Sequence, residues 1–327
     1  MSTSIISSLA FAGNQLIIYG SISILVAGVL GNLLNIIVFL SLRTFRQNSC
    51  AFYLTIMSIA NVCQLFTGVL SRIMTGIYGS DGTDLSLVYC KFRFFITQIF
   101  AVTTLTCFSL VTIDQYCATS PHPRLQKLSS IKVARGLIII FSLFWILHGI
   151  LQLVFYNHII KAGTNTVSCG ITNSIYQQYR IYVTNLTFLG FLPVLITVLF
   201  GSMAYYNVRR NAHYTAPLVR RELDKQLTAM VLVQVLINIF VLLPSSITDV
   251  IGLSTNINNA PITKAQLQFS SAITLIIFYG YYANSFYIYV CVSERFRRQL
   301  IYVIFRNYPN QLQRQPKVIL NQVEPQL

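Results

Sequence analysis

The stretch LVYCKFRFFITQIFAVTTLTCFSLVTIDQYC, residues 87–117, decides the fold. Its charged side chains lie near its ends, at Lys91, Arg93 and Asp114, and residues 94–113 carry none. About 20 apolar helical residues cross the roughly 30 Å of hydrocarbon in a bilayer. The stretch is therefore predicted to be a transmembrane helix.

Similar runs recur along the whole chain of 327 residues. Only 9% of its residues are charged and 54% are hydrophobic, whereas a soluble domain has roughly 25% charged residues. The sequence predicts an all-α integral membrane protein with a seven-transmembrane helix bundle. The seven runs are approximately Gln15–Leu42, Ala51–Gly76, Leu87–Cys117, Val133–Tyr156, Ile181–Tyr206, Leu227–Leu253 and Leu267–Val292.

Basic residues are distributed unequally between the two sets of loops. Lys and Arg in short loops are retained on the cytoplasmic side of a membrane. One set of loops, together with the C-terminal segment, holds most of the 23 Lys and Arg residues, including the groups at 43–46, 124–135, 209–225 and 295–317. This asymmetry predicts an outer amino terminus and a cytoplasmic carboxyl terminus. It also accounts for the net charge of +15 without a nucleic-acid partner and favours contact with anionic membrane lipid.

The same pattern divides the chain into three parts. Residues 1–14 are predicted to be an extracellular N-terminus, residues 15–305 the seven-transmembrane domain, and residues 306–327 a disordered cytoplasmic tail. Because residues 1–14 carry no basic residue, the first span is expected to act as a signal anchor.

Two of the seven cysteines, Cys90 and Cys169, are expected to face the oxidising exterior. A bridge between them would hold the second outer loop over the mouth of the bundle, with a loop-entropy gain of about 4 kcal/mol. The alternative is two free thiols.

Motifs in all seven runs resemble one family. Gly31-Asn32 lies in the first run, FYLTIMSIANVCQL in the second, and Cys90 precedes Gln115 by 25 positions. Trp145 lies in the fourth run, Pro193 and Pro244 in the fifth and sixth, and NSFYIYVCVSERFRRQL in the seventh. In order and spacing these motifs resemble those of the rhodopsin-like (class A) G-protein-coupled receptors.

The resemblance implies a plasma-membrane receptor with an extracellular ligand, a heterotrimeric G protein as partner, and a short amphipathic cytoplasmic helix after the seventh span. The sequence DQY, which is Asp114, Gln115 and Tyr116, stands where the family has Asp-Arg-Tyr and is expected to face the G protein. Gln115 has no charge, so a bond to Asp224 would be weaker than an Arg pair, and the lock of the inactive state is expected to be looser. For Asp114 the alternative is a carboxylate solvated at a helix end.

Other positions of the family's activation core also differ. Asn61 replaces the usual Asp, so a sodium site of the family type would lack its formal charge. Val241-Leu242-Leu243-Pro244 lacks the usual aromatic residue before Pro244. Ser285 and Phe286 stand where Asn-Pro is usual, with Tyr289 as the terminal Tyr. The expected switch residues are Asn32, Asn61, Pro193, Pro244, Ser285 and Tyr289, although the amide and hydroxyl groups could equally be structural hydrogen-bonding groups.

The ligand end is less distinctive. Arg72 and Arg93 are charged residues near the outer mouth, where they could bind a carboxylate, phosphate or sulfate or simply extend toward the membrane surface. Thr97 and Tyr279 stand where amine receptors and opsins carry Asp and Lys, which argues against an amine ligand and a retinal pigment and leaves a peptide as the favoured class. The ligand-binding candidates are Arg72, Arg93, Gln98, Asp249, Tyr279 and Tyr282.

Competing functions have less support in the sequence. There is no metal-ligand spacing, phosphate loop or pair of acids within a span, so no enzyme activity, metal or cofactor is expected. Paired interrupted helices, typical of transporters, are missing. A receptor-like protein that binds ligand or a partner without activating a G protein remains the main alternative, and a transporter or channel is a weaker one.

Overall fold

The structure is a computed structural model that describes residues 2–41, 43–160, 166–210, 218–254 and 261–305. Its first half contains α1 (Ser2–Ser41), α2 (Arg43–Arg46), α3 (Ser49–Gln64), η1 (Leu65–Val69), α4 (Leu70–Tyr78), α5 (Leu87–Thr119), α6 (Pro123–Leu128) and α7 (Ile131–Phe155). Its second half contains β1 (Tyr156–Ile160), β2 (Val167–Ile171), α8 (Ser174–Tyr179), η2 (Arg180–Phe191), α9 (Leu192–Arg210), α10 (Leu218–Ser254), α11 (Pro261–Gly280), α12 (Ser285–Val292) and α13 (Glu294–Ile304). The η elements are π-helical.

Six helical segments of the described chain are long and apolar enough to cross a membrane. A seventh is obtained if α11 and α12, whose axes differ by 54°, form one bent span. The chain therefore folds as a seven-helix membrane bundle, followed by α13 near the C-terminus.

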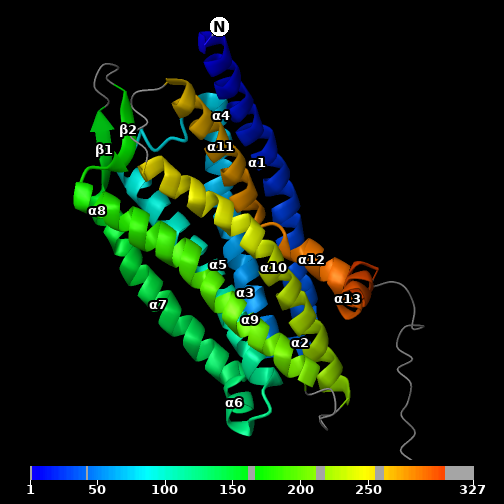
Figure 1. Ribbon diagram of the computed structural model, residues 1–327. Helices are drawn as coiled ribbons and strands as arrows, with labels where there is room; N and C mark the ends of the chain where they lie inside the picture. Colours follow the sequence, from blue (N-terminus) through cyan, green and yellow to red (C-terminus); the bar gives the residue numbers. More distant parts are fainter. Residues whose placement is uncertain (1, 42, 161–165, 211–217, 255–260, 306–327) are drawn as a thin grey trace, which may run out of the picture.

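The helices form one elongated bundle with distinct ends (Figure 1). α5 runs through it and packs against α3, α7 and α9. We call the end that carries strands β1 and β2 the hairpin end, and the N-terminus also lies there (Figure 1). The opposite end, with α2 and α6, carries Arg46, Arg124 and Arg209 and is called the basic end.

Local sequence signals explain where several helices begin. The side chains of Asn48, Ser86, Asn173 and Ser293 each accept a hydrogen bond from a backbone N–H in the first turn of α3, α5, α8 and α13, respectively. Such caps supply an acceptor for N–H groups that have no partner within the helix. α4 ends at Gly79, whose positive φ of 76° is a left-handed conformation that glycine adopts without strain.

The first helix is longer than the sequence indicates. It begins at Ser2 rather than near Gln15, and its 40 residues correspond to about 60 Å. This length is about twice the hydrocarbon thickness of a membrane. Residues 2–14 therefore continue the helix beyond the predicted start of the first span.

The seventh run is not one continuous helix. Between α11 and α12 the backbone N–H groups of Tyr281, Tyr282 and Ala283 bond to the carbonyls three residues before them, which tightens the chain into turns. The Tyr282 carbonyl, released from the helix, accepts a hydrogen bond from Asn32 Nδ2 at 2.8 Å. This interhelical bond supports the break, which the sequence did not predict because no proline marks it.

The two prolines lie in different helical surroundings. Pro193 is buried and is the second residue of α9, which follows the wider π-helical segment η2. Pro244 lies inside α10, which continues through it. Proline has no N–H to donate within a helix, so both helices lose one backbone hydrogen bond.

Two apolar clusters fill the bundle. One lies toward the basic end around Val38, Met57, Phe108 and Tyr289, and the other lies nearer the hairpin end around Leu65, Val69, Leu105 and Tyr282. α1 approaches its neighbours closely because of glycines. A Cβ at Gly28 would lie 2.7 Å from Leu65 Cδ1 and 3.0 Å from Ala283 Cβ.

This contact yields a stability prediction. Gly28→Ala should lower the unfolding temperature of the purified protein, because overpacking a closely packed core costs about 1–3 kcal/mol. Gly136→Ala is the matched control, since nothing lies within 4 Å of its added Cβ and alanine favours a helix. Equal unfolding temperatures for the two variants, measured by thermal denaturation in detergent, would contradict the packing described.

Candidate functional site

The hairpin end is tied together by a disulfide bond and a short sheet. Cys90, at the start of α5, is bonded to Cys169 in β2. Cys169 pairs with His158 in the antiparallel register of β1 and β2. His158 Nε2 lies 2.9 Å from the carbonyl oxygen of Thr83, in the loop between α4 and α5. The hairpin is thus attached both to α5 and to the preceding loop.

That loop is organised by the carboxylate of Asp81. It accepts hydrogen bonds from the hydroxyls of Ser71 at 2.7 Å and Thr83 at 2.6 Å, and it forms an ion pair with Arg93. The side chains of Asp81 and Arg93 are each only 11% exposed. Burial by itself raises the pKa of Asp81, but the hydrogen bonds and the charge of Arg93 outweigh it, so the pKa is lowered. Asp81 therefore stays ionised at neutral pH.

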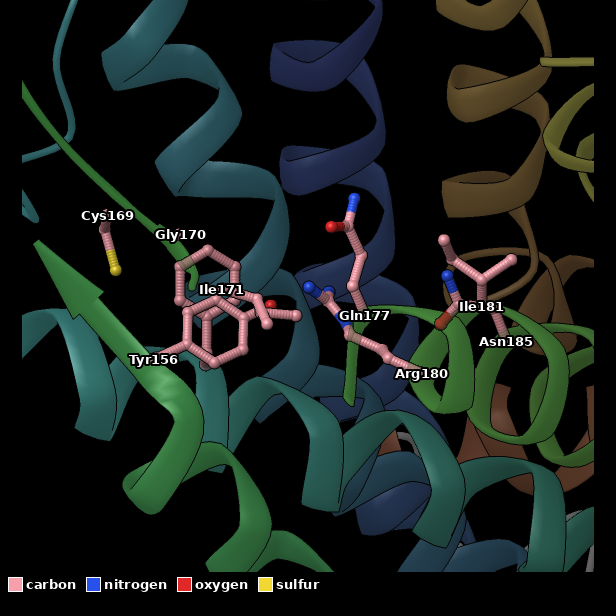
Figure 2. Close-up of a pocket in the computed structure, with 9 residues that line it drawn as sticks. Tyr156, Cys169, Gly170, Ile171, Gln177, Arg180, Ile181 and Asn185 are labelled. Atoms are coloured by element: carbon pink, nitrogen blue, oxygen red, sulfur yellow. The ribbon is translucent and has the colours of Figure 1, made fainter. Parts of the chain in front are cut away.

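A pocket of about 320 Å³ lies beneath the hairpin, between α5, β2 and the start of the fifth span. Phe94 and Tyr156 stack with ring centroids 4.2 Å apart on one side. The guanidinium of Arg180 lies over both rings, and Figure 2 shows Gln177 and Arg180 between Cys169 on one side and Ile181 and Asn185 on the other. The pocket combines aromatic surface with amide and guanidinium groups, a composition suited to a ligand with both apolar and polar parts.

The sequence-based ligand candidates separate into two groups. Arg72, Arg93 and Tyr279 lie together beside Asp81, close enough to interact electrostatically. Gln98 is buried in α5, and its Nε2 has no hydrogen-bond partner among the described residues. Tyr282 is 0% exposed, so its ring belongs to the apolar core and does not line the mouth. The side chain of Asp249 lies outside the described residues.

None of these candidates lines the pocket of 320 Å³. Its polar lining residues Gln177, Arg180 and Asn185 were not singled out from the sequence, nor was Tyr156. The cause lies in the fold. Arg180 begins the π-helical segment η2, and Tyr156 begins a strand that was not predicted from the sequence. Neither position could therefore be inferred from α-helical spacing. Only the position of Phe94 next to Arg93 was available as a signal.

In the middle of the bundle, uncharged side chains form a network of hydrogen bonds. Asn61 Nδ2 donates to Asn32 Oδ1 at 3.0 Å, and Asn61 Oδ1 accepts from Thr104 at 3.0 Å. Asn32 Nδ2 also donates to the carbonyls of Gly28 and Tyr282. Ser285 accepts from Asn35 Nδ2 at 3.1 Å. The network joins α1, α3 and α5 to the break before α12 without a formal charge.

At the basic end, the DQY residues make separate contacts. Asp114 is 7% exposed and accepts a hydrogen bond from the Ser49 hydroxyl, whose oxygen lies 2.8 and 2.9 Å from the two carboxylate oxygens. Asp114 is therefore buried and hydrogen-bonded, in contrast to the alternative of a carboxylate solvated at the helix end. Gln115 is 2% exposed, and its Oε1 accepts a 2.6 Å hydrogen bond from Thr228 in α10. Tyr116 packs on Phe200 of α9.

The bond from Thr228 to Gln115 is one of three bonds between described side chains that hold the half of α10 nearer the basic end. Tyr289 donates to Gln234 Oε1 at 2.5 Å, and Ser293 donates to Gln226 Oε1 at 3.1 Å. We call these three hydrogen bonds the α10 latch. All the groups that form it are uncharged. The side chain of Asp224, the partner considered for Gln115 from the sequence, lies outside the described residues.

Comparison with known families now decides the identity. The family described as 7 transmembrane receptor (rhodopsin family) matches residues 31–287, which is more than half of the chain. The chain belongs to the rhodopsin family of seven-transmembrane receptors. No curated protein matches this receptor at a significant level. The matched residues include Asn32, Asn61 and Thr104 of the network and the pocket beneath the hairpin. They also include Gln115 and Thr228 of the α10 latch, whereas Tyr289 and Ser293 lie beyond the match.

Membership makes this receptor a multi-pass membrane protein of the G-protein-coupled class. Among its described residues, no group of three His, Cys, Asp or Glu side chains lies close enough to hold a metal ion. Its prominent chemistry is instead hydrogen bonding at the basic end and cation and aromatic contacts at the hairpin end.

Asp81 gives the receptor a pH-dependent contribution to stability. Because the folded pKa is lowered, the contribution is present above the unfolded value of about 3.9 and is lost as the pH falls through the folded pKa. Asp81→Asn should unfold at a lower temperature than wild type at pH 7, and the gap should narrow below about pH 4. Thermal denaturation from pH 7 to pH 3 measures this difference. A gap that stays constant over that range would contradict the role of the Asp81 ionisation.

Proposed function

We propose that this protein is a plasma-membrane receptor whose hairpin end faces outward, with an outer N-terminus and a cytoplasmic C-terminus. An extracellular ligand binds at that end, and the inner half of α10 opens at the basic end to engage a heterotrimeric G protein. The observation that carries the proposal is the α10 latch, because it joins α10 to α5, α12 and the start of α13 by bonds that an outward movement would break.

The strength of the latch suits a reversible switch. Hydrogen bonds between membrane helices contribute about 0.6 kcal/mol each, so three of them contribute roughly 2 kcal/mol to the closed state. A ligand shifts such an equilibrium only if it binds the open state more tightly. A difference of this size leaves a few per cent of molecules open without ligand. We therefore expect a low but measurable basal activity.

A peptide is the ligand class we favour. The pocket beneath the hairpin is lined by Gln177, Arg180 and Asn185 together with stacked aromatic rings, which supports recognition of backbone amides and an aromatic side chain. The ends of the pocket are formed by β2 and η2, so a ligand there would contact the hairpin and the fifth span at once.

In the main alternative, the protein has the receptor fold but does not activate a G protein. Gln115 is buried against Thr228 and lacks the positive charge that the family usually presents to the G protein. A receptor of this kind would bind its ligand, or a partner receptor, without activating a G protein.

Loosening the latch tests the proposal without a known ligand. Thr228→Val removes the donor to Gln115 and should raise basal G-protein activation about two- to five-fold, since roughly 0.5–1 kcal/mol is lost from the closed state. Thr274→Val is the matched control, because Thr274 is only partly buried and its hydroxyl donates to the backbone of its own helix. The measurement is nucleotide exchange on a panel of purified alpha subunits with receptor in nanodiscs.

The same assay includes Gln115→Arg. Activation by wild type and a rise in Thr228→Val would support coupling through Gln115. Activation by Gln115→Arg alone would support the alternative in which the wild-type receptor does not activate a G protein because residue 115 carries no positive charge. Silence of all variants toward every alpha subunit, with correct folding, would overturn the proposal of G-protein coupling.

A further inference from the structure

From the contacts at the hairpin end we infer that Arg72, Arg93 and Tyr279 form a binding site for a carboxylate group of the ligand, and that Asp81 is the competing carboxylate built into the receptor. The inference rests on the proposed function, because it names the ligand chemistry that the outer mouth selects. It concerns a second site beside the pocket beneath the hairpin, joined to it through the ring of Phe94, over which the Arg93 guanidinium lies at 4.9 Å.

The charges of the site do not balance. Two guanidinium groups, those of Arg72 and Arg93, lie within electrostatic range of each other and of a single carboxylate, that of Asp81. Only Arg93 is ion-paired with it, and neither of the two ion pairs found among the described residues includes Arg72. The site therefore carries an excess of one positive charge, which attracts a monovalent anion.

Arg72 is accessible to such an anion. It is the third residue of α4 and is exposed, although the neighbouring Ser71 and Ile73 are buried. Its guanidinium lies close enough to the Tyr279 hydroxyl of α11 to interact with it electrostatically. Tyr279 packs closely against Gly68 of η1, where an added Cβ would lie 3.3 Å from the ring and 3.4 Å from the hydroxyl. The absence of a side chain at Gly68 thus allows Tyr279 to reach this position.

Arg93 supplies the second half of the site. Its Nη1 is bonded to Asp81, while its Nε is buried and has no hydrogen-bond partner among the described residues. A buried donor without a partner costs free energy that an incoming acceptor recovers. A planar carboxylate fits this arrangement, because guanidinium groups bind carboxylates through two parallel N–H donors.

The ion pair of Asp81 shows that the site accepts a carboxylate. Because Asp81 competes with the ligand, it also lowers the affinity of the site for a ligand carboxylate. It already occupies one guanidinium, held there by Ser71 and Thr83, so a ligand carboxylate binds mainly through Arg72 and competes for Arg93. The excess of one positive charge remains at neutral pH because Asp81 is ionised there. Removing the charge of Asp81 should therefore strengthen anion binding rather than weaken it.

The test uses small probes that differ in one group. N-acetylphenylalanine carries a free carboxylate and N-acetylphenylalanine amide does not, whereas N-acetyl-aspartyl-phenylalanine amide carries the carboxylate on a side chain. Binding to full-length receptor in nanodiscs is measured by ligand-observed NMR, with an expected Kd of about 1 mM for the acid. We expect the amide to bind at least about five-fold more weakly. Comparison of the two acids distinguishes a chain terminus from an acidic side chain as the source of the carboxylate.

Substitutions assign the binding to this site. Arg72→Gln should weaken the acid at least about five-fold and leave the amide unchanged. Lys264→Gln, which removes an equal charge from the start of α11, is the control for long-range attraction and should change the Kd less than about two-fold. Asp81→Asn should strengthen the acid several-fold, whereas Asp84→Asn in the same loop, where Asp84 is bonded to Ser80, should not. If Arg72→Gln does not fold, Tyr279→Phe is the second test, and it should also weaken binding of the acid.

The outcomes separate this inference from the proposed function. Equal binding of acid and amide, or unchanged acid binding in both Arg72→Gln and Tyr279→Phe, would overturn the carboxylate site whatever the receptor couples to. Selective acid binding that these substitutions abolish would support it even if no G protein responded, since the measurement does not involve the basic end.

Discussion

The side-chain amide of Asn32 holds the centre of this bundle together. Its Nδ2 donates to the carbonyls of Gly28 and Tyr282, and its Oδ1 accepts from Asn61, which in turn accepts from Thr104. In hydrocarbon every buried polar group must find its partner within the protein. The broken backbone before α12 is therefore tolerable only because Asn32 satisfies the carbonyl that the helix has released. The position of α12, and with it Tyr289 and one bond of the α10 latch, depends on this amide.

The sequence predicted the features of this structure that follow from the membrane as the surrounding solvent. Long apolar runs gave the seven-helix bundle, and the family resemblance anticipated the match to residues 31–287. The breaks inside those runs could not be predicted, because the π-helical segments η1 and η2 and the turns at 281–284 are set by packing between helices rather than by proline or glycine alone. For the same reason the first helix was placed too short at its beginning, since Ser and Gly before Gln15 do not distinguish a helix from a loop.

At the candidate site the limits of the sequence are more specific. Arg72 and Arg93 could be chosen because charges near hydrocarbon are rare. Asp81, the ion-pair partner of Arg93, could not, because it lies in a loop whose path is fixed by the hydroxyls of Ser71 and Thr83. Gln115 was singled out from the sequence, but its partner depends on the rotation of α10, which places Thr228 against it. Residue type indicated which positions carry the polar and charged groups. The partners of those groups depend on how neighbouring helices pack, which the sequence did not reveal.

The absence of charge from the middle of this bundle has an electrical consequence. Among the described buried polar side chains, only Asp114 carries a formal charge, and it lies at the basic end. A charge that moves across the whole membrane field changes in energy by about 2.3 kcal/mol per 100 mV. The amides and hydroxyls of the network and the α10 latch carry no such charge when they rearrange. If α10 opens as proposed, breaking the described hydrogen bonds of the network and the latch would by itself move no formal charge through the membrane field.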